Sequence, residues 1–168
     1  KEAQKIYEEI LKNDLKEDFK DKINYGLAWV SFQTGDYEKA YNLFTVLQKS
    51  SDDSLAINSL YWSGEAKRYL GDSKTANEIY KNFIEKYPEH PLASRAQLSM
   101  GTVFFGTDNP LEAEKMLLKA SVSKDPATKG KANTLLGEMR LNQKNFEQAR
   151  DYFHTALKYT KGDDELLN

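Results

Sequence analysis

Cysteine is absent from this chain of 168 residues, and histidine occurs only twice. The absence of cysteine excludes disulfide bonds, thiol nucleophiles and cysteine-ligated metals. It leaves the cellular compartment open, because proteins of oxidising and reducing compartments alike can lack cysteine. Long apolar runs are missing as well, so these residues contain neither a transmembrane helix nor the apolar core of a signal peptide.

An excess of one charge sign is also lacking. The chain carries 24 basic and 26 acidic side chains, and its formal net charge is −2. Because the two signs are interspersed, they form neither the basic patch that nucleic acid requires nor a basic cluster that would bind an anionic membrane. We therefore expect no nucleic-acid partner and no direct insertion into a membrane.

Motifs for catalysis or metal binding are missing too. His90 lies in a turn between two prolines, and His154 lies on a predicted helix beside Phe153. No H-E-x-x-H, G-x-S-x-G or EF-hand pattern occurs. Residues 124–131 (KDPATKGK) lack the first glycine of a phosphate-binding loop and follow no strand, so an interhelical turn is the better interpretation. The sequence thus predicts no enzyme activity, no cofactor and no metal site.

The sequence does contain an internal repeat. Alanine recurs with an apolar residue four positions later, and the alanines stand 37, 36, 37 and 36 residues apart, at Ala3, Ala40, Ala76, Ala113 and Ala149. In the last four units a small residue precedes the alanine by twelve positions, namely Ala28, Gly64, Gly101 and Gly137. A fixed period of this length indicates stacked copies of one supersecondary unit.

The stretch 60–91 shows this unit most clearly. Two amphipathic segments are joined by a glycine-aspartate turn, and a proline ends the second segment. Ala76, Tyr80 and Phe83 are spaced by four and three residues, so they share one face of a helix. Gly64 in the first segment leaves room for another helix to approach closely. The unit is therefore predicted to be a helical hairpin.

These residues resemble the tetratricopeptide repeat (TPR), whose pattern is W-x2-L-G-x2-Y, then A-x3-F, then P, at a period of about 34 residues. The second half of that pattern is well kept. The first half is eroded, because the tryptophan position of the family is occupied here by Asn24, Leu60, Gln97 and Asn133. The resemblance implies a stack of antiparallel helix pairs that binds other proteins and catalyses no reaction.

The second full repeat also resembles longer repeats of bacterial periplasmic and outer-membrane assembly proteins, such as the coordinator of the Tol-Pal system and the lipoprotein of the β-barrel assembly machinery. The residues that carry this likeness are the run 61–66 (YWSGEA), Gly71-Asp72, Ala76 and Tyr87-Pro88. The likeness implies a periplasmic or outer-membrane-associated protein within an envelope assembly or transport complex. A cytoplasmic location is the alternative.

The predicted fold class is all-α, an α-α superhelix or TPR-like solenoid of about four and a half helical hairpins. We expect a single repeat domain over residues 1–168 that is a fragment of a longer protein. Its half repeat is placed at 1–15, and its full repeats are placed at 21–54, 57–90, 94–127 and 130–163. The charged stretch 14–21 is predicted to be a connector, and residues 161–168 are predicted to begin another repeat.

The resemblance implies that the first helix of each repeat lines a concave groove. On the corresponding helices here, the face away from the small packing residues carries a mainly aromatic stripe at spacings of three and four. We predict that this stripe binds a partner peptide or helix through Tyr25, Trp29, Phe32, Tyr61, Glu65, Arg68, Tyr69, Leu98 and Phe105. The alternative for single rings such as Trp29 or Phe32 is packing against the neighbouring repeat.

The predicted function is that of a non-catalytic protein–protein interaction scaffold that presents a rigid surface to a protein or peptide. A second hypothesis is self-association into a homo-oligomer, in which the unpaired helices at 2–13 and 163–168 stack on another copy. A third makes the chain a regulatory or targeting segment of a larger enzyme. A clamp for a C-terminal carboxylate is disfavoured, because aromatic and acidic residues occupy the face where such clamps in the family carry lysine and asparagine.

Overall fold

The computed structural model describes residues 2–13 and 15–160, and these residues form nine α-helices and no strand. The helices are α1 (Glu2–Ile10), α2 (Glu17–Gln33), α3 (Tyr37–Leu47), α4 (Asp53–Tyr69), α5 (Ser73–Lys86), α6 (Ala93–Gly106), α7 (Pro110–Ala120), α8 (Pro126–Asn142) and α9 (Phe146–Thr160). The predicted all-α, TPR-like helical-repeat fold is confirmed. None of the helices in these described ranges is long and apolar enough to cross a membrane.

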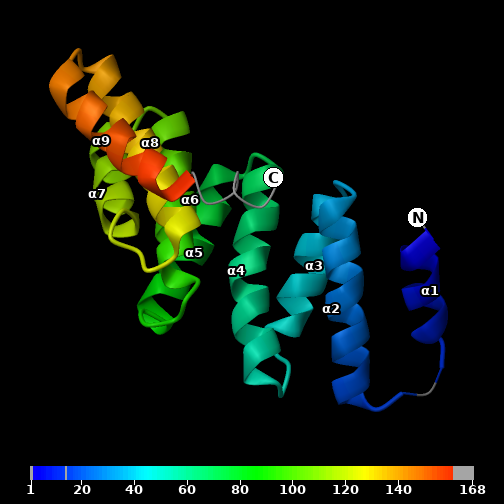
Figure 1. Ribbon diagram of the computed structural model, residues 1–168. Helices are drawn as coiled ribbons and strands as arrows, with labels where there is room; N and C mark the ends of the chain where they lie inside the picture. Colours follow the sequence, from blue (N-terminus) through cyan, green and yellow to red (C-terminus); the bar gives the residue numbers. More distant parts are fainter. Residues whose placement is uncertain (1, 14, 161–168) are drawn as a thin grey trace, which may run out of the picture. The chain divides into compact units, whose positions relative to one another are not determined.

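The chain divides into two compact units, Lys1–Phe83 and Ile84–Asn168. In the first unit α1 packs on α2, α3 packs on both α2 and α4, and α2 contacts α4 directly (Figure 1). The core of this packing consists of Ala28, Ala40, Phe44, Leu47 and Ala66. Because α2 and α4 touch, the first helices of two successive hairpins contribute to one continuous surface.

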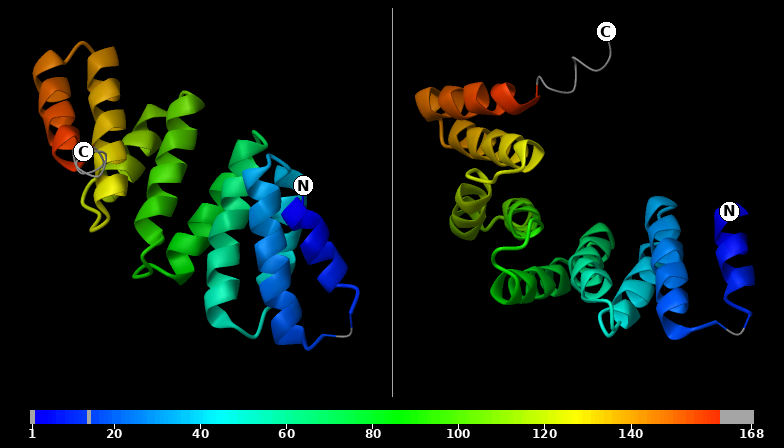
Figure 2. Two further views of the ribbon diagram at one scale, coloured as in Figure 1. Left: turned by 45° about the vertical axis from the view of Figure 1, so that its right-hand side comes forward. Right: turned by 60° about the horizontal axis from the view of Figure 1, so that its bottom comes forward.

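The second unit contains the last residues of α5 and the two hairpins α6–α7 and α8–α9. α8 packs on α6, on α7 and on α9, and Figure 2 shows α8 and α9 lying side by side as an antiparallel pair. One core cluster of this unit consists of Ala113, Leu117, Leu136 and Met139. The same hairpin thus recurs here with aliphatic residues at several positions that are aromatic in the first unit.

In three of the hairpins the repeated small residue, a glycine, faces the repeated large one. A methyl group built on Gly64 would lie only 2.8 Å from Cε1 of Tyr80, which is closer than carbon atoms pack. The same holds for Gly101 against Leu117 and for Gly137 against Phe153. The prediction that Gly64 permits close approach of another helix is confirmed, and the twelve-residue spacing from small residue to alanine reflects this contact.

The turn inside each hairpin contains one residue with a positive φ angle. These residues are Gly35 at 83°, Gly71 at 79°, Asp108 at 54° and Lys144 at 59°. The next amide N–H donates to the carbonyl oxygen five residues back, as from Asp36 to Ser31 at 2.9 Å. This bond satisfies a carbonyl that the end of the helix leaves without an intrahelical partner. The left-handed residue therefore sets where the second helix starts.

The start of α2 differs from the sequence prediction. Residues 14–21 were expected to form a connector, whereas the helix begins at Glu17. Glu17 and Asp18 occupy its first turn, where acidic side chains suit the positive end of the helix dipole, and Glu17 pairs with Lys20 at 3.0 Å. The charged residues of this stretch thus form the exposed first turn of α2. The predicted further repeat at 161–168 lies outside the described residues.

Candidate functional site

Six aromatic rings of the first unit contact one another across α2, the start of α3 and α4. We call them the aromatic cluster: Tyr25, Trp29, Phe32, Tyr37, Trp62 and Tyr69. The ring centroids of Trp29 and Trp62 are 4.3 Å apart. Phe32 lies 5.4 Å from Trp62 and 5.3 Å from Tyr69, so it joins rings of two successive hairpins.

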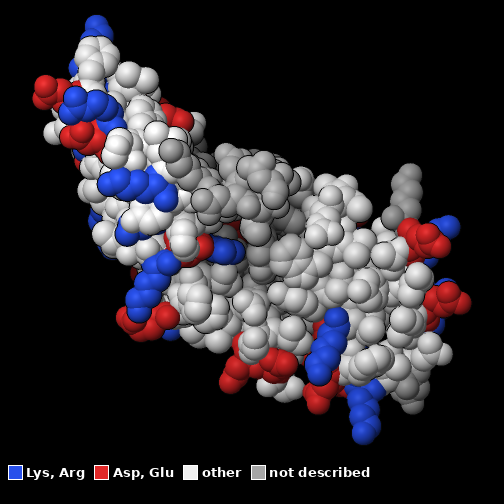
Figure 3. Space-filling view, in the orientation of Figure 1, with Lys and Arg blue, Asp and Glu red and all other residues white. Residues whose placement is uncertain are grey.

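The aromatic cluster is partly open to solvent. Tyr69 is 50% exposed, and the other five rings are half-buried. Tyr37 stacks on Tyr69 with centroids 4.9 Å apart and planes 20° from parallel. On the face drawn in Figure 3, the surface over α2 and α4 is mostly uncharged, and acidic and basic groups gather along its lower edge. An uncharged centre with a charged rim is the usual composition of a protein interface.

Tyr61 and Glu65 are more buried than the other predicted contact residues of α4, although the Tyr61 ring also lies 5.1 Å from the ring of Trp62. Each is only 5% exposed. The Tyr61 ring packs 5.9 Å from the ring of Phe83, and the Glu65 carboxylate accepts a hydrogen bond from the Tyr80 hydroxyl at 2.7 Å. Both side chains therefore pack between α4 and α5. Their role in peptide binding stays a prediction, and the aromatic cluster does not include them.

Arg68 connects the buried Glu65 carboxylate to the aromatic cluster. Its Nη2 lies 2.7 Å from Glu65 Oε2, and its guanidinium lies over the Tyr69 ring, 4.3 Å from the centroid. Burial disfavours the charged form of Arg68, but the Glu65 carboxylate outweighs this effect and raises the pKa of the guanidinium. The Arg68 charge is thus fixed in place, where it also orients Tyr69.

Two rings of the aromatic cluster were missed by sequence reasoning. Trp62 precedes Tyr69 by seven residues on the same helix, which places both on one face, so the helical period could have found it. Tyr37 follows the hairpin turn directly and belongs to a second helix, where no groove residue was sought. The structure brings these two rings together with Tyr25, Trp29, Phe32 and Tyr69.

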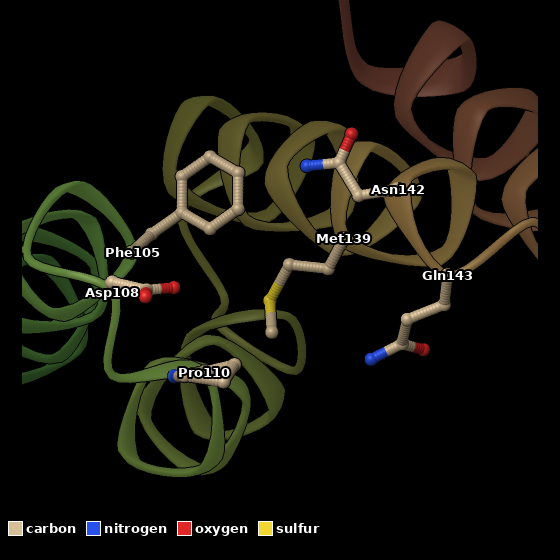
Figure 4. A pocket seen from close by; sticks show the side chains of 6 residues that line it. All are labelled: Phe105, Asp108, Pro110, Met139, Asn142 and Gln143. Carbon is tan, nitrogen blue, oxygen red and sulfur yellow. The ribbon is translucent and has the colours of Figure 1, made fainter.

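The remaining predicted contact residues, Leu98 and Phe105, belong to the second unit. Both are half-buried and pack against the core that α7 and α8 form. Phe105 also lines a cavity of about 320 Å³ between the end of α6, the start of α7 and the end of α8, which we call the Asp108 pocket (Figure 4). The other lining residues are Asp108, Pro110, Met139, Asn142 and Gln143.

Metal binding finds no geometric support in the described ranges. No group of three or more histidine or acidic residues is placed there to hold an ion. Glu65 and Glu114 each pair with an arginine side chain. These surfaces offer rings, amides and single charges for recognition.

Models of the tetratricopeptide repeat match three parts of the chain. One model matches residues 58–90, and another matches residues 25–50 and 142–163. The matched segments contain most of the α4–α5 and α2–α3 hairpins and all of α9, and they support a place in the tetratricopeptide-repeat family. Repeats of this family generally mediate protein–protein interaction and are typically non-catalytic. No curated protein sequence matches the chain.

Proposed function

We propose that this chain is a protein-interaction module that binds a peptide or helix of a partner protein on the aromatic cluster of its first unit. The observation that carries the proposal is the partial exposure of rings that already contact one another across α2, α3 and α4. Aromatic side chains have few rotatable bonds, so covering them costs little conformational entropy. Their edge-to-face contacts hold them in place before binding, which lowers that cost further.

Polar groups at the edge of the aromatic cluster offer hydrogen bonds that would orient a bound peptide. Tyr37 and Tyr69 carry hydroxyl groups, and the Arg68 guanidinium lies against the Tyr69 ring. A peptide with an apolar face and an acceptor oxygen at its margin matches this combination. The peptide binding that the sequence predicts is thus proposed for the predicted residues of α2 and α4. Trp62 of α4 and Tyr37 of α3 are added to them.

Self-association is a second candidate function. Ile6 on α1 is 52% exposed, so the first helix presents an apolar side chain that a second copy could cover. Sedimentation at increasing protein concentration tests this candidate directly. A setting in a bacterial envelope complex is a proposal that rests on the resemblance of the second full repeat alone, with a cytoplasmic setting as its alternative.

Selection of a random dodecapeptide library on the chain, followed by fluorescence anisotropy with the retained peptides, tests the main proposal. Tyr69→Ala removes a ring that is half exposed, so it should weaken binding on the order of tenfold while the helical circular-dichroism signal is kept. Phe19→Ala is the matched control, because Phe19 is 49% exposed on α2 and lies outside the aromatic cluster.

The control variant should bind as the unchanged chain does. Equal weakening by Tyr69→Ala and Phe19→Ala, or retention of no peptide at all, would count against the aromatic cluster as the binding site. If no peptide is retained and the sedimenting mass rises with concentration, self-association becomes the better account.

A further inference from the structure

The Asp108 pocket combines one carboxylate, two amides and an apolar floor. Figure 4 shows the Asp108 carboxylate and the Met139 side chain pointing toward the middle of the cavity, between the Phe105 ring and Pro110. Asn142 and Gln143 come from the end of α8, on the side opposite Asp108. Met139 is buried, whereas Asp108, Asn142 and Gln143 are exposed, so the cavity is apolar at its base and polar at its rim.

Asp108 occupies a backbone position that favours glycine. Its φ angle is 54°, and the two corresponding turns of the first unit have Gly35 and Gly71 at this position. A side chain in the left-handed region costs conformational energy on the order of 1 kcal/mol. Here that conformation directs a carboxylate into a cavity. Within the described part of the chain, neither a cation nor a hydrogen-bond donor contacts this carboxylate.

The charge balance around the Asp108 pocket favours a cationic ligand group. The Arg140 guanidinium contacts the lining residue Gln143, and it is held by Glu114 and by the Gln143 side-chain oxygen at 2.9 Å. The hydrogen bond that Arg140 donates to the Glu114 carboxylate raises the pKa of Arg140, so this charge is fixed and already compensated. The start of α7 contributes about half a positive charge, which is less than the full negative charge on Asp108.

We propose that the Asp108 pocket binds an arginine or lysine side chain of a partner protein. The methylene groups of the ligand side chain would lie on Phe105 and Met139, and the charged end would donate hydrogen bonds to Asp108 and to the amide oxygens at the rim. An anionic ligand is opposed by the carboxylate, and a purely apolar one would cover the Asp108 carboxylate without supplying a hydrogen-bond donor to it. This site lies in the second unit and is independent of the aromatic cluster.

Methionine-methyl NMR offers a direct test, because the chain has only three methionines and one of them lines the cavity. The probes are N-acetyl-arginine amide and its uncharged counterpart N-acetyl-norleucine amide. The arginine probe should shift the Met139 methyl signal saturably, with a Kd on the order of millimolar, and leave Met116 unchanged. The norleucine probe should bind roughly fivefold more weakly, because it lacks the ion pair.

Asp108→Asn keeps the shape of the side chain and tolerates the left-handed backbone, so it isolates the charge. This variant should weaken the arginine probe roughly fivefold, while Glu147→Gln, an exposed charge change on α9, should not. The proposal is overturned if norleucine binds as well as arginine, if Asp108→Asn binds arginine unchanged, or if neither probe shifts Met139. None of these outcomes depends on Tyr69 or on peptide binding by the first unit.

Discussion

The Tyr80 hydroxyl donates a hydrogen bond of 2.7 Å to the Glu65 carboxylate in the interior of the α4–α5 hairpin. Tyr80 is fully buried and Glu65 nearly so, and Arg68 neutralises the same carboxylate from the other side. A buried carboxylate without partners would be strongly destabilising, so the three side chains stabilise the hairpin only as a set. Glu65 therefore serves a structural purpose in the free protein.

Removal of the Tyr80 hydroxyl should destabilise the protein in a pH-dependent way. Burial, and then the Glu65 charge, raise the pKa of Tyr80 above its ordinary value of 10.0. A group whose pKa is raised on folding stabilises the folded state fully at pH values below its pKa in the unfolded chain. This stabilisation is lost progressively as the pH rises from the unfolded pKa toward the higher folded pKa. Tyr80→Phe leaves the buried Glu65 carboxylate without this hydrogen bond, so it should lower the free energy of unfolding by about 1–3 kcal/mol near neutral pH.

Above pH 10 the difference between the two proteins should shrink. The unchanged chain loses up to about 1.4 kcal/mol per pH unit there from this one group, and the variant does not. Urea unfolding at several pH values from neutral to alkaline measures both trends. Parallel curves for Tyr80→Phe and the unchanged chain across pH 10 would contradict the assignment.

The contact between Gly64 and Tyr80 predicts a second change in stability. An alanine methyl at Gly64 would press on a ring that is fully buried and held by Glu65, so the ring cannot move aside cheaply. Gly64→Ala should lower the free energy of unfolding by about 1–3 kcal/mol. Gly106→Ala is the control, because nothing lies within 4 Å of its added methyl, and it should be neutral or stabilising by about 0.5–1 kcal/mol. Calorimetric melting of both variants measures these changes in stability.

The hairpins could be predicted from the sequence because each of their determinants is local. The spacing between Gly64 and Ala76 is set by two helices packed across one short turn, so it survives even where the family's tryptophan and tyrosine positions are lost. Turn glycines such as Gly71 mark the left-handed residue directly. Such features repeat at a fixed period and require no knowledge of distant contacts.

The candidate surface was harder to predict because α4 is covered on more than one side. Helix α4 packs on α2, on α3 and, through Tyr61, on Phe83 of α5, so no single apolar face distinguishes buried from exposed positions. Glu65 is buried because Tyr80, fifteen residues later, supplies a hydroxyl to it. The helical periodicity of a sequence does not reveal a hydrogen bond between side chains of two helices. The Asp108 pocket could not be predicted for a similar reason, because it forms only where three helices meet.

Lys144 should be replaceable by glycine with a gain in stability. It occupies the left-handed turn position at a φ angle of 59°, its side chain is exposed, and the equivalent turns of the first unit have glycine. Lys144→Gly should raise the free energy of unfolding by about 1 kcal/mol, since it removes the steric conflict of a Cβ atom there. Lys158→Gly within α9 should instead lower it by about 1 kcal/mol. Thermal melting that ranks the two variants the other way would contradict the turn geometry.

Two buried serines of α4 allow a matched comparison of hydroxyl groups. Ser59 and Ser63 are both fully buried. Ser63 donates to the Leu60 carbonyl at 2.8 Å and accepts from the Gln48 amide at 3.1 Å, whereas among the described residues the Ser59 hydroxyl has no partner. Burying a hydroxyl without a partner is unfavourable, and removing one that has partners leaves those partners unsatisfied.

Ser59→Ala should therefore raise the free energy of unfolding by about 1 kcal/mol, and Ser63→Ala should lower it by about 1–2 kcal/mol. The side-chain volume removed is the same in both variants, so packing losses cancel in the comparison. Chemical unfolding of the two proteins under one set of conditions gives the difference directly. Equal stability of the two variants would mean that the Ser59 hydroxyl is satisfied in solution, for instance by an internal water, and that α4 is packed less tightly than its contacts indicate.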